Sequence, residues 1–154
     1  MTYFYFDTSG LAKRYINETG SVWVRNACSF ASGNVVFVAE ITSVEITSAI
    51  IRRSRGGTLT IADAEASLSR FEADTLNEYI TLEITSKLIA DARRLVKTHG
   101  LRGYDAVQLS IAVSLNQSQI DMGLPVITFV SADNELLSAA ESAGLTVENP
   151  NNYA

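Results

Sequence analysis

The chain is poor in cysteine, histidine and proline, with one, one and two of these among its 154 residues. With Cys28 alone no internal disulfide can form, which fits a reducing cytoplasm. A single Cys and a single His99 also argue against a Cys/His zinc site. His99 stands at a predicted helix end, so no Ser-His-Asp or Cys-His nucleophile set is available. No Pro/Ser-rich linker and no repeat divides the chain, and we expect one domain over residues 1–154.

Long apolar runs are also missing. No stretch approaches the ~20 residues needed to span a bilayer. The N-terminal segment MTYFYFDTSG has neither the basic region nor the small-residue cleavage site of a signal peptide. Hydrophobic residues make up 47% and charged residues 19%, as in an ordinary globular domain. We therefore expect a cytoplasmic protein that does not associate with membranes.

The chain has no excess of basic charge, since its formal net charge is −5. Most nucleic-acid-binding domains have a basic surface, although bound metal would offset some of the acids here. The basic residues gather near predicted helix ends, as Lys13-Arg14, Arg52-Arg53-Arg55 and Arg93-Arg94-Lys97. Each group fits a solvated helix C-terminus. If the groups converged on one cleft, they would instead form a track for phosphates.

Short apolar strands alternate with helices along the whole chain. The predicted strands are Tyr3–Phe6, Val35–Val38, Ile80–Ile84, Val126–Val130 and Leu145–Val147. The predicted helices are Ser9–Ile16, Ser21–Ala31, Thr42–Arg55, Ile61–Leu76, Ser86–His99, Tyr104–Leu115 and Asn134–Ala143. Strands this apolar between helices indicate a parallel sheet that is covered on both faces. We predict the α/β class, as a three-layer α/β/α sandwich with a mainly parallel central sheet.

Four acids occur where apolar sequence makes a charge costly. Asp7 and Asp133 come after the first and fourth predicted strands, and Glu45 and Asp105 lie in predicted helices. Active sites of parallel sheets lie beyond the carboxyl ends of the strands. Because no basic partner is evident, we expect a divalent cation with oxygen ligands to compensate the acids. Such a centre is suited to cutting phosphodiesters.

Each acid also has a purely structural interpretation. The two acids that follow strands would be helix N-caps. Asp105 would be an acid in the first turn of its helix, where Arg102 could pair with it or touch substrate. Glu45 would be a helix surface position, and Glu40 competes with it at the strand-to-helix junction. These alternatives remain open at the level of sequence.

Four segments, in order along the whole chain, resemble the PIN-domain ribonucleases, and among them the VapC toxins of prokaryotic toxin–antitoxin pairs. They are FDTSGLAKRY, TSVEITSAI, LRGYDAVQLSIA and TFVSADNELLSAAESAGLTVENP. The resemblance implies one or two Mg²⁺ or Mn²⁺ ions held by the catalytic acids Asp7, Glu45, Asp105 and Asp133. It gives auxiliary roles to Ser9 and Ser131. The chain departs from the family pattern at Gly10, where a bulkier helix former is more usual.

The resemblance also implies an RNA substrate and a small antitoxin, whose tail would lay a basic side chain into the acidic cleft. We predict RNA contacts at Lys13, Arg14, Arg52, Arg53, Arg55 and Arg102. A homodimer is expected from the helices between Thr42 and Leu76, because their apolar side chains exceed what one face of a thin sandwich obviously buries. These side chains are Ile46, Ala49, Ile50, Leu59, Ile61, Ala62, Leu68 and Phe71.

The sequence thus predicts a Mg²⁺- or Mn²⁺-dependent endoribonuclease, with the toxin role as first choice. The alternatives of the same fold are a non-toxin nuclease and a non-catalytic RNA-binding or scaffold domain, and the latter would be expected to have lost acids. A signalling receiver domain would need a phosphoacceptor Asp after a central strand, but Thr85-Ser86 follows Ile80–Ile84. A dinucleotide-binding domain is excluded because no G-x-G-x-x-G follows the first strand.

Overall fold

The computed structural model describes residues 1–154 and has a five-stranded sheet at its centre. The strands are β1 (Tyr3–Phe6), β2 (Val35–Ala39), β3 (Tyr79–Leu82), β4 (Ile127–Val130) and β5 (Thr146–Glu148). Their order is β3-β2-β1-β4-β5, and every neighbouring pair is parallel. The chain builds outward from β1 in both directions, so the strand order switches between β1 and β4.

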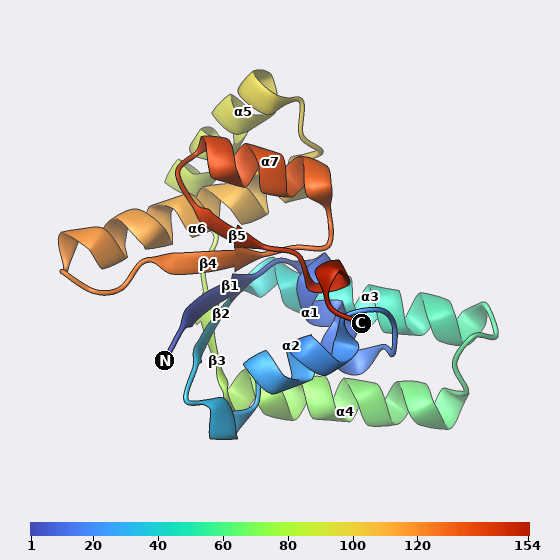
Figure 1. The fold of residues 1–154 in the computed structure, drawn as a ribbon. Coiled ribbons are helices and arrows are strands. Elements are labelled where there is room, and N and C mark those ends of the chain that lie inside the picture. Colours follow the sequence, from blue (N-terminus) through green and yellow to red (C-terminus); the bar gives the residue numbers. More distant parts are fainter.

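Helices cover both faces of the sheet, which confirms the predicted three-layer α/β/α sandwich (Figure 1). The helices on one face, below the sheet in the figure, are α1 (Thr8–Tyr15), α2 (Ser21–Ala27), α3 (Glu40–Arg55) and α4 (Ile61–Asn77). Those on the other face are α5 (Ser86–His99), α6 (Gly103–Asp121) and α7 (Asn134–Ser142). The two 3-10 helices are Phe30–Ser32 and Pro150–Asn152.

Alternation of side chains along β1 divides the core in two. Phe4 and Phe6 point toward α1–α4, whereas Tyr5 points toward α5–α7. Tyr5 is fully buried and stacks on Phe129 of β4, with 5.6 Å between the ring centroids. Burying one large apolar side chain stabilises a fold by roughly 1.5–3 kcal/mol. Packing of these buried aromatic side chains therefore holds β1 and β4 in fixed positions relative to each other.

Two predicted helix boundaries differ substantially from the structure. The helix expected over Ser21–Ala31 ends at Ala27, and a 3-10 turn follows. The helix expected to stop at Leu115 continues to Asp121. Its last turns are tied to the following loop, because Asn116 Oδ1 accepts from the Ile127 N–H at 3.0 Å and Gln119 Nε2 donates to a loop carbonyl at 3.2 Å. Neither α6 nor any other helix is long and apolar enough to cross a bilayer.

Most of the apolar residues that we assigned to a homodimer interface pack inside the monomer, so that assignment is wrong for them. Ile46, Ile50 and Phe71 are buried. Ala49, Leu59 and Leu68 pack against the same core. The physical reason is that α3 and α4 turn this side toward the sheet and α1. Other apolar residues are exposed instead and line a groove of about 800 Å³ between α3 and α4, namely Val44, Ile51 and Leu76.

Candidate active site

The four predicted acids come from elements that meet at the carboxyl end of the sheet. Asp7 directly follows β1, and its backbone N–H donates to the Val130 carbonyl of β4 at 3.0 Å. Asp133 follows β4 and precedes α7. Helix α3 starts directly after β2, on the other side of β1, and carries Glu45. Asp105 lies in the first turn of α6. The acids therefore surround the switch in strand order, where parallel sheets bind ligands.

Asp7 is a buried carboxylate, with only 3% of the residue exposed. Its Oδ1 accepts from the Gly10 N–H at 2.8 Å, and its Oδ2 accepts from the Ser131 hydroxyl at 2.7 Å. The Ser9 hydroxyl lies 2.8 and 2.9 Å from the two oxygens. Burial raises the pKa of Asp7 to about 6, and the charge of Asp105 adds to the rise, although the three hydrogen-bond donors oppose it.

The two predicted auxiliary serines connect Asp7 with the loop that carries Asp133. The hydroxyl oxygens of Ser9 and Ser131 are 3.2 Å apart. The Ser9 Oγ accepts from the Ala132 N–H at 2.9 Å, and the Ser131 Oγ accepts from the Asp133 N–H at 3.1 Å. A continuous hydrogen-bonded unit thus fixes the spacing between the ends of β1 and β4.

Glu45 is held by side chains from two other parts of the chain. Its Oε1 accepts from the Thr8 hydroxyl at 2.7 Å and from Gln108 Nε2 at 3.3 Å. Gln108 also donates to the Thr42 hydroxyl at 3.0 Å and accepts from the Tyr5 hydroxyl at 2.6 Å. Glu40, the competing acid, instead lies at the start of α3, where its carboxylate accepts from a distant backbone N–H at 3.4 Å.

Gln108 is a site residue that the sequence reasoning missed. It is only 2% exposed and links Glu45 to Tyr5 of β1. The available signal was its position in α6, three residues after Asp105 and within an otherwise apolar run. A polar side chain on such a face needs a buried partner, and Thr42 and Glu45 are those partners.

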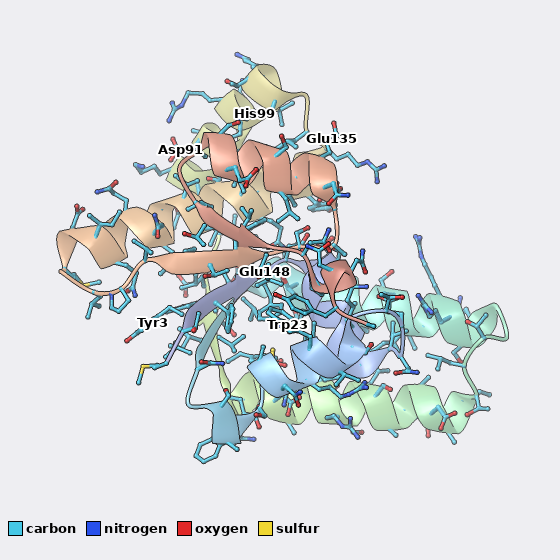
Figure 2. The ribbon with its side chains drawn as sticks, in the orientation of Figure 1. Tyr3, Trp23, Asp91, His99, Glu135 and Glu148 are labelled. Carbon is cyan, nitrogen blue, oxygen red and sulfur yellow. The ribbon has the colours of Figure 1, made fainter.

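Asp105 is half-buried and accepts no hydrogen bond. Burial raises its pKa, and the charges of Asp133, Glu45 and Glu135 raise it further. Glu135 stands in the first turn of α7 (Figure 2). Arg102 lowers the pKa of Asp105 without forming an ion pair with it, so the direct pairing that the sequence left open does not occur.

Two of the acids also act as helix N-caps, as the structural interpretation predicted. Asp7 caps α1, and Asp133 Oδ1 accepts from two N–H groups of α7 at 2.9 and 3.3 Å. Capping leaves a carboxylate oxygen of Asp133 free for a ligand, because Asp133 Oδ2 accepts no hydrogen bond. The Oε2 of Glu45 and both carboxylate oxygens of Asp105 are likewise free. Capping and ligand binding are therefore compatible.

The donor set fits a hard divalent cation such as Mg²⁺ or Mn²⁺. All the candidate ligands are oxygens, and no ion pair in the structure includes any of the four acids. With the side chains as they stand, no three acids are grouped closely enough to hold a metal ion. The fit thus rests on free carboxylate oxygens and on uncompensated charge, and metal binding by these residues stays a prediction.

Two of the predicted RNA contacts are wrong, because their side chains are used inside the fold. Lys13 is 4% exposed and donates to Glu18 at 3.1 Å. Arg14 is also largely buried, pairs with Glu78 at 2.8 Å and lies 3.3 Å from Asp74. Both residues hold α1 against its neighbours. Burial removes water from their charged groups, and the ion pairs with acidic side chains offset this cost.

The other predicted RNA contacts are on the surface. Arg52, Arg55 and Arg102 are exposed and form no ion pair. Arg53 is also exposed, but its guanidinium lies 3.2 Å from the Glu18 carboxylate. Arg52 and Arg53 line a hollow that also includes Glu45, and Arg102 lines a second hollow with Asp105. These placements leave their RNA contacts as predictions.

Gly10, the departure from the family pattern, is explained by close packing at the strand ends. A Cβ atom at this position would lie 2.9 Å from the Val130 carbonyl oxygen, and 3.3 Å from both Asp7 Oδ1 and Phe6 Cδ1. Such contacts with backbone and with a fixed carboxylate leave no room for a side chain. The glycine therefore allows α1 to approach β4 closely enough to position Asp7.

We expect Gly10→Ala to lower the free energy of unfolding by up to about 2 kcal/mol. Overpacking costs about 1–3 kcal/mol, and the gain of about 1 kcal/mol in helix propensity offsets part of that loss. Urea denaturation measures the change. The matched control is Gly103→Ala in the first turn of α6, where a Cβ meets no atom within 4 Å and stability should hold or rise. Equal stability of the two variants would contradict the packing argument.

Comparison with known proteins points to one family. No protein-family model matches the chain. Two curated relatives are Ribonuclease VapC45 of Mycobacterium tuberculosis (strain CDC 1551 / Oshkosh) and Ribonuclease VapC49 of Mycobacterium tuberculosis (strain ATCC 25618 / H37Rv). Each is 31% identical over 151 residues, which cover 93% of this chain and 92% of the relative.

Solved structures with low sequence identity share the fold. PAE2754 from Pyrobaculum aerophilum has a TM-score of 0.61 at 20% identity, over 96% of this chain and 89% of that one. VapBC2 from Rickettsia felis, bound to a DNA fragment from their promoter, has a TM-score of 0.62 at 14% identity, over 96% and 98%. FitAcB from Neisseria gonorrhoeae has a TM-score of 0.62 at 18% identity, over 96% and 97%.

Proposed function

The chain belongs to the VapC ribonucleases, the PIN-domain endoribonuclease toxins of toxin–antitoxin systems, and from this membership we propose that it hydrolyses RNA phosphodiesters with the help of Mg²⁺. Mn²⁺ is the alternative ion. The observation that carries the proposal is a group of acids that lacks any cationic partner and surrounds the switch in strand order. The residues in catalytic and metal-binding roles are Asp7, Glu45, Asp105 and Asp133.

The chain's own residues prepare the site for a metal and a phosphate. When bound, Mg²⁺ supplies charge that polarises a phosphate oxygen and lowers the pKa of a bound water. Asp7 is held in one orientation by Ser9 and Ser131, so its charge is fixed before ligand arrives. Gln108 fixes one oxygen of Glu45 and leaves the other free. The first turn of α6 presents Asp105 with no competing hydrogen bond.

Cleavage of total cellular RNA by the purified protein tests the proposal. We expect cleavage with Mg²⁺ or Mn²⁺ and none after chelation with EDTA, with activity restored when excess metal is returned. An Asp105→Asn preparation, made in parallel, controls for contaminating ribonucleases and should be inactive. Equal cleavage with EDTA and with Mg²⁺, or by both preparations, would reject metal-dependent catalysis by this chain.

We propose a small antitoxin as the partner protein. The neighbours from Rickettsia felis and Neisseria gonorrhoeae are named VapBC2 and FitAcB, and the family consists of paired toxins. No lysine or arginine of this chain pairs with the four acids. Their negative charge is therefore available to attract a basic side chain of a partner protein. The proposed reaction takes place in the cytoplasm. A homodimer stays a prediction, but the assigned interface residues that are buried in the monomer are no longer part of the predicted interface.

Expression of the chain alone is expected to arrest bacterial growth, because uninhibited cleavage would deplete RNA that the cell needs. Co-expression with the antitoxin should relieve the arrest, and Asp7→Asn expressed alone should cause none. Colony counts after induction measure the effect. If wild-type protein accumulates in active form and growth continues, the toxin role fails and the nuclease activity stands.

A further inference from the structure

Tyr104 is an aromatic side chain beside the acidic site whose ring stacks on no other ring and whose hydroxyl forms no hydrogen bond. The chain has 6 tyrosines. The other five either stack on an aromatic ring or use their hydroxyl in a hydrogen bond between side chains. Tyr104 does neither, and it is 62% exposed in the first turn of α6, next to Asp105. An exposed aromatic ring with no partner, next to a catalytic acid, is available to a ligand.

Two hollows meet at Tyr104. One of about 600 Å³ lies between α5 and α6 and includes Arg93 and Arg102. The other, of about 670 Å³, lies along α3 and includes Arg52 and Arg53. Tyr104 and Glu45 line both hollows. A phosphodiester chain that crosses the acids would therefore meet two guanidinium groups on either side of one exposed ring.

The lining of the hollows suits nucleotides. Arg52, Arg93 and Arg102 form no ion pair, so their charge is free to hold phosphates. Each hollow also has apolar side chains at its surface, such as Ile89 in the first and Val44 in the second. Apolar walls with a few cationic groups match the flat, apolar faces of bases joined by anionic phosphates.

We propose that Tyr104 is a positioning residue on which an unpaired RNA base stacks next to the bond that is cut, while the arginines of the two hollows hold the flanking phosphates. The proposal rests on the proposed function, and it adds the residue that sets the position of the strand. Stacking needs a free base face, which a base-paired duplex does not offer. An unpaired strand is therefore the substrate form that this surface accepts.

The first test compares Tyr104→Ala and Tyr104→Phe on a short unstructured RNA. Loss of one base–aromatic stack should raise KM by about tenfold with kcat nearly unchanged, whereas the phenylalanine variant keeps the ring and should behave as wild type. Phe30→Ala removes an aromatic side chain that is 89% exposed in a different part of the fold, and serves as the matched control. A normal KM for Tyr104→Ala would overturn the proposal.

RNA binding without cleavage separates this inference from the proposed function. Fluorescence anisotropy with a labelled unstructured RNA, measured in the Asp7→Asn background, should show about tenfold weaker binding for Tyr104→Ala. If wild type binds through Tyr104 but never cuts RNA, the inference holds and the catalytic function fails. If the same variant instead abolishes a dimer in sedimentation and leaves RNA affinity of the monomer unchanged, the surface is a subunit contact and the inference is overturned.

The salt dependence of RNA affinity, measured by the same fluorescence anisotropy, tests the role of the arginines. Removal of one arginine that binds a phosphate should reduce the slope of log affinity against log salt by about 0.7 for a single strand. We expect this reduction for Arg52→Gln and Arg102→Gln, and no reduction for Arg70→Gln on the exposed side of α4. An identical slope in all three variants would overturn the assignment of phosphates to the hollows.

Discussion

Replacement of Asp7 by Asn is expected to lower kcat for RNA cleavage by about 100-fold or more, because the variant loses a fixed charge that holds metal. The fold should persist, since an amide can take over the hydrogen bonds. The Asn oxygen can accept from Gly10, and its NH₂ group can donate to the hydroxyl oxygens of Ser9 and Ser131.

The same variant should be more stable than wild type at pH 7 without metal. Burial raises the pKa of Asp7 from 3.8 to about 6, so ionisation of the folded protein costs up to about 3 kcal/mol at neutral pH. Asn carries no charge and avoids this cost. Thermal and urea unfolding in EDTA measure the gain. Asp63→Asn, an exposed acid in the first turn of α4, is the control and should retain both activity and wild-type stability within about 0.5 kcal/mol. A folded Asp7→Asn protein with wild-type cleavage would contradict the metal role.

The pH dependence of stability should reveal the same carboxylate. Because the folded pKa of Asp7 lies above the unfolded value, the folded state binds more protons between these two values. The free energy of unfolding of the metal-free protein therefore falls as pH rises from about 4 to about 6, by up to about 3 kcal/mol, and the loss persists above pH 6. Asp105 acts in the same direction, since its pKa is also raised.

Urea denaturation of wild type and Asp7→Asn across pH 4–8 isolates the contribution of Asp7 as a difference. We expect the two curves to converge near pH 4 and to separate as pH rises. Saturating Mg²⁺ should raise the stability of wild type at pH 7, because metal bound only to the folded state shifts the equilibrium toward it. A difference between the variants that stays constant across pH would show that Asp7 does not titrate as its burial requires.

Sequence pattern predicted the parts of this structure that depend on local periodicity. The apolar run Tyr3–Phe6 and its counterparts predicted buried strands, and the position of Asp7 and Asp133 after two of them predicted the acidic end of the sheet. These inferences succeed because a buried parallel strand has a composition that helices between strands do not share. The pattern also marked Glu45 and Asp105 as acids in apolar helices, and the resemblance to a family added the expectation that these two acids act together with Asp7 and Asp133 in catalysis.

Long-range pairing explains what the sequence did not predict. Lys13 and Arg14 looked like a surface group, but Arg14 meets Asp74 and Glu78, about sixty residues away in the chain. Gln108 acquires its role from contacts with Tyr5 and Glu45 that only the packed fold creates. Local periodicity carries no information about such partners, so these roles became visible only in the structure.

We propose that the acids at the switch in strand order form a metal centre that cuts RNA. Calorimetric titration of Mn²⁺ into wild type, Asp105→Asn and Asp63→Asn tests it most directly, with cleavage assayed on the same samples. We predict that wild type and Asp63→Asn bind Mn²⁺ and cleave RNA, and that Asp105→Asn binds at least tenfold more weakly and is inactive. Equal Mn²⁺ affinity in all three proteins would contradict the claim.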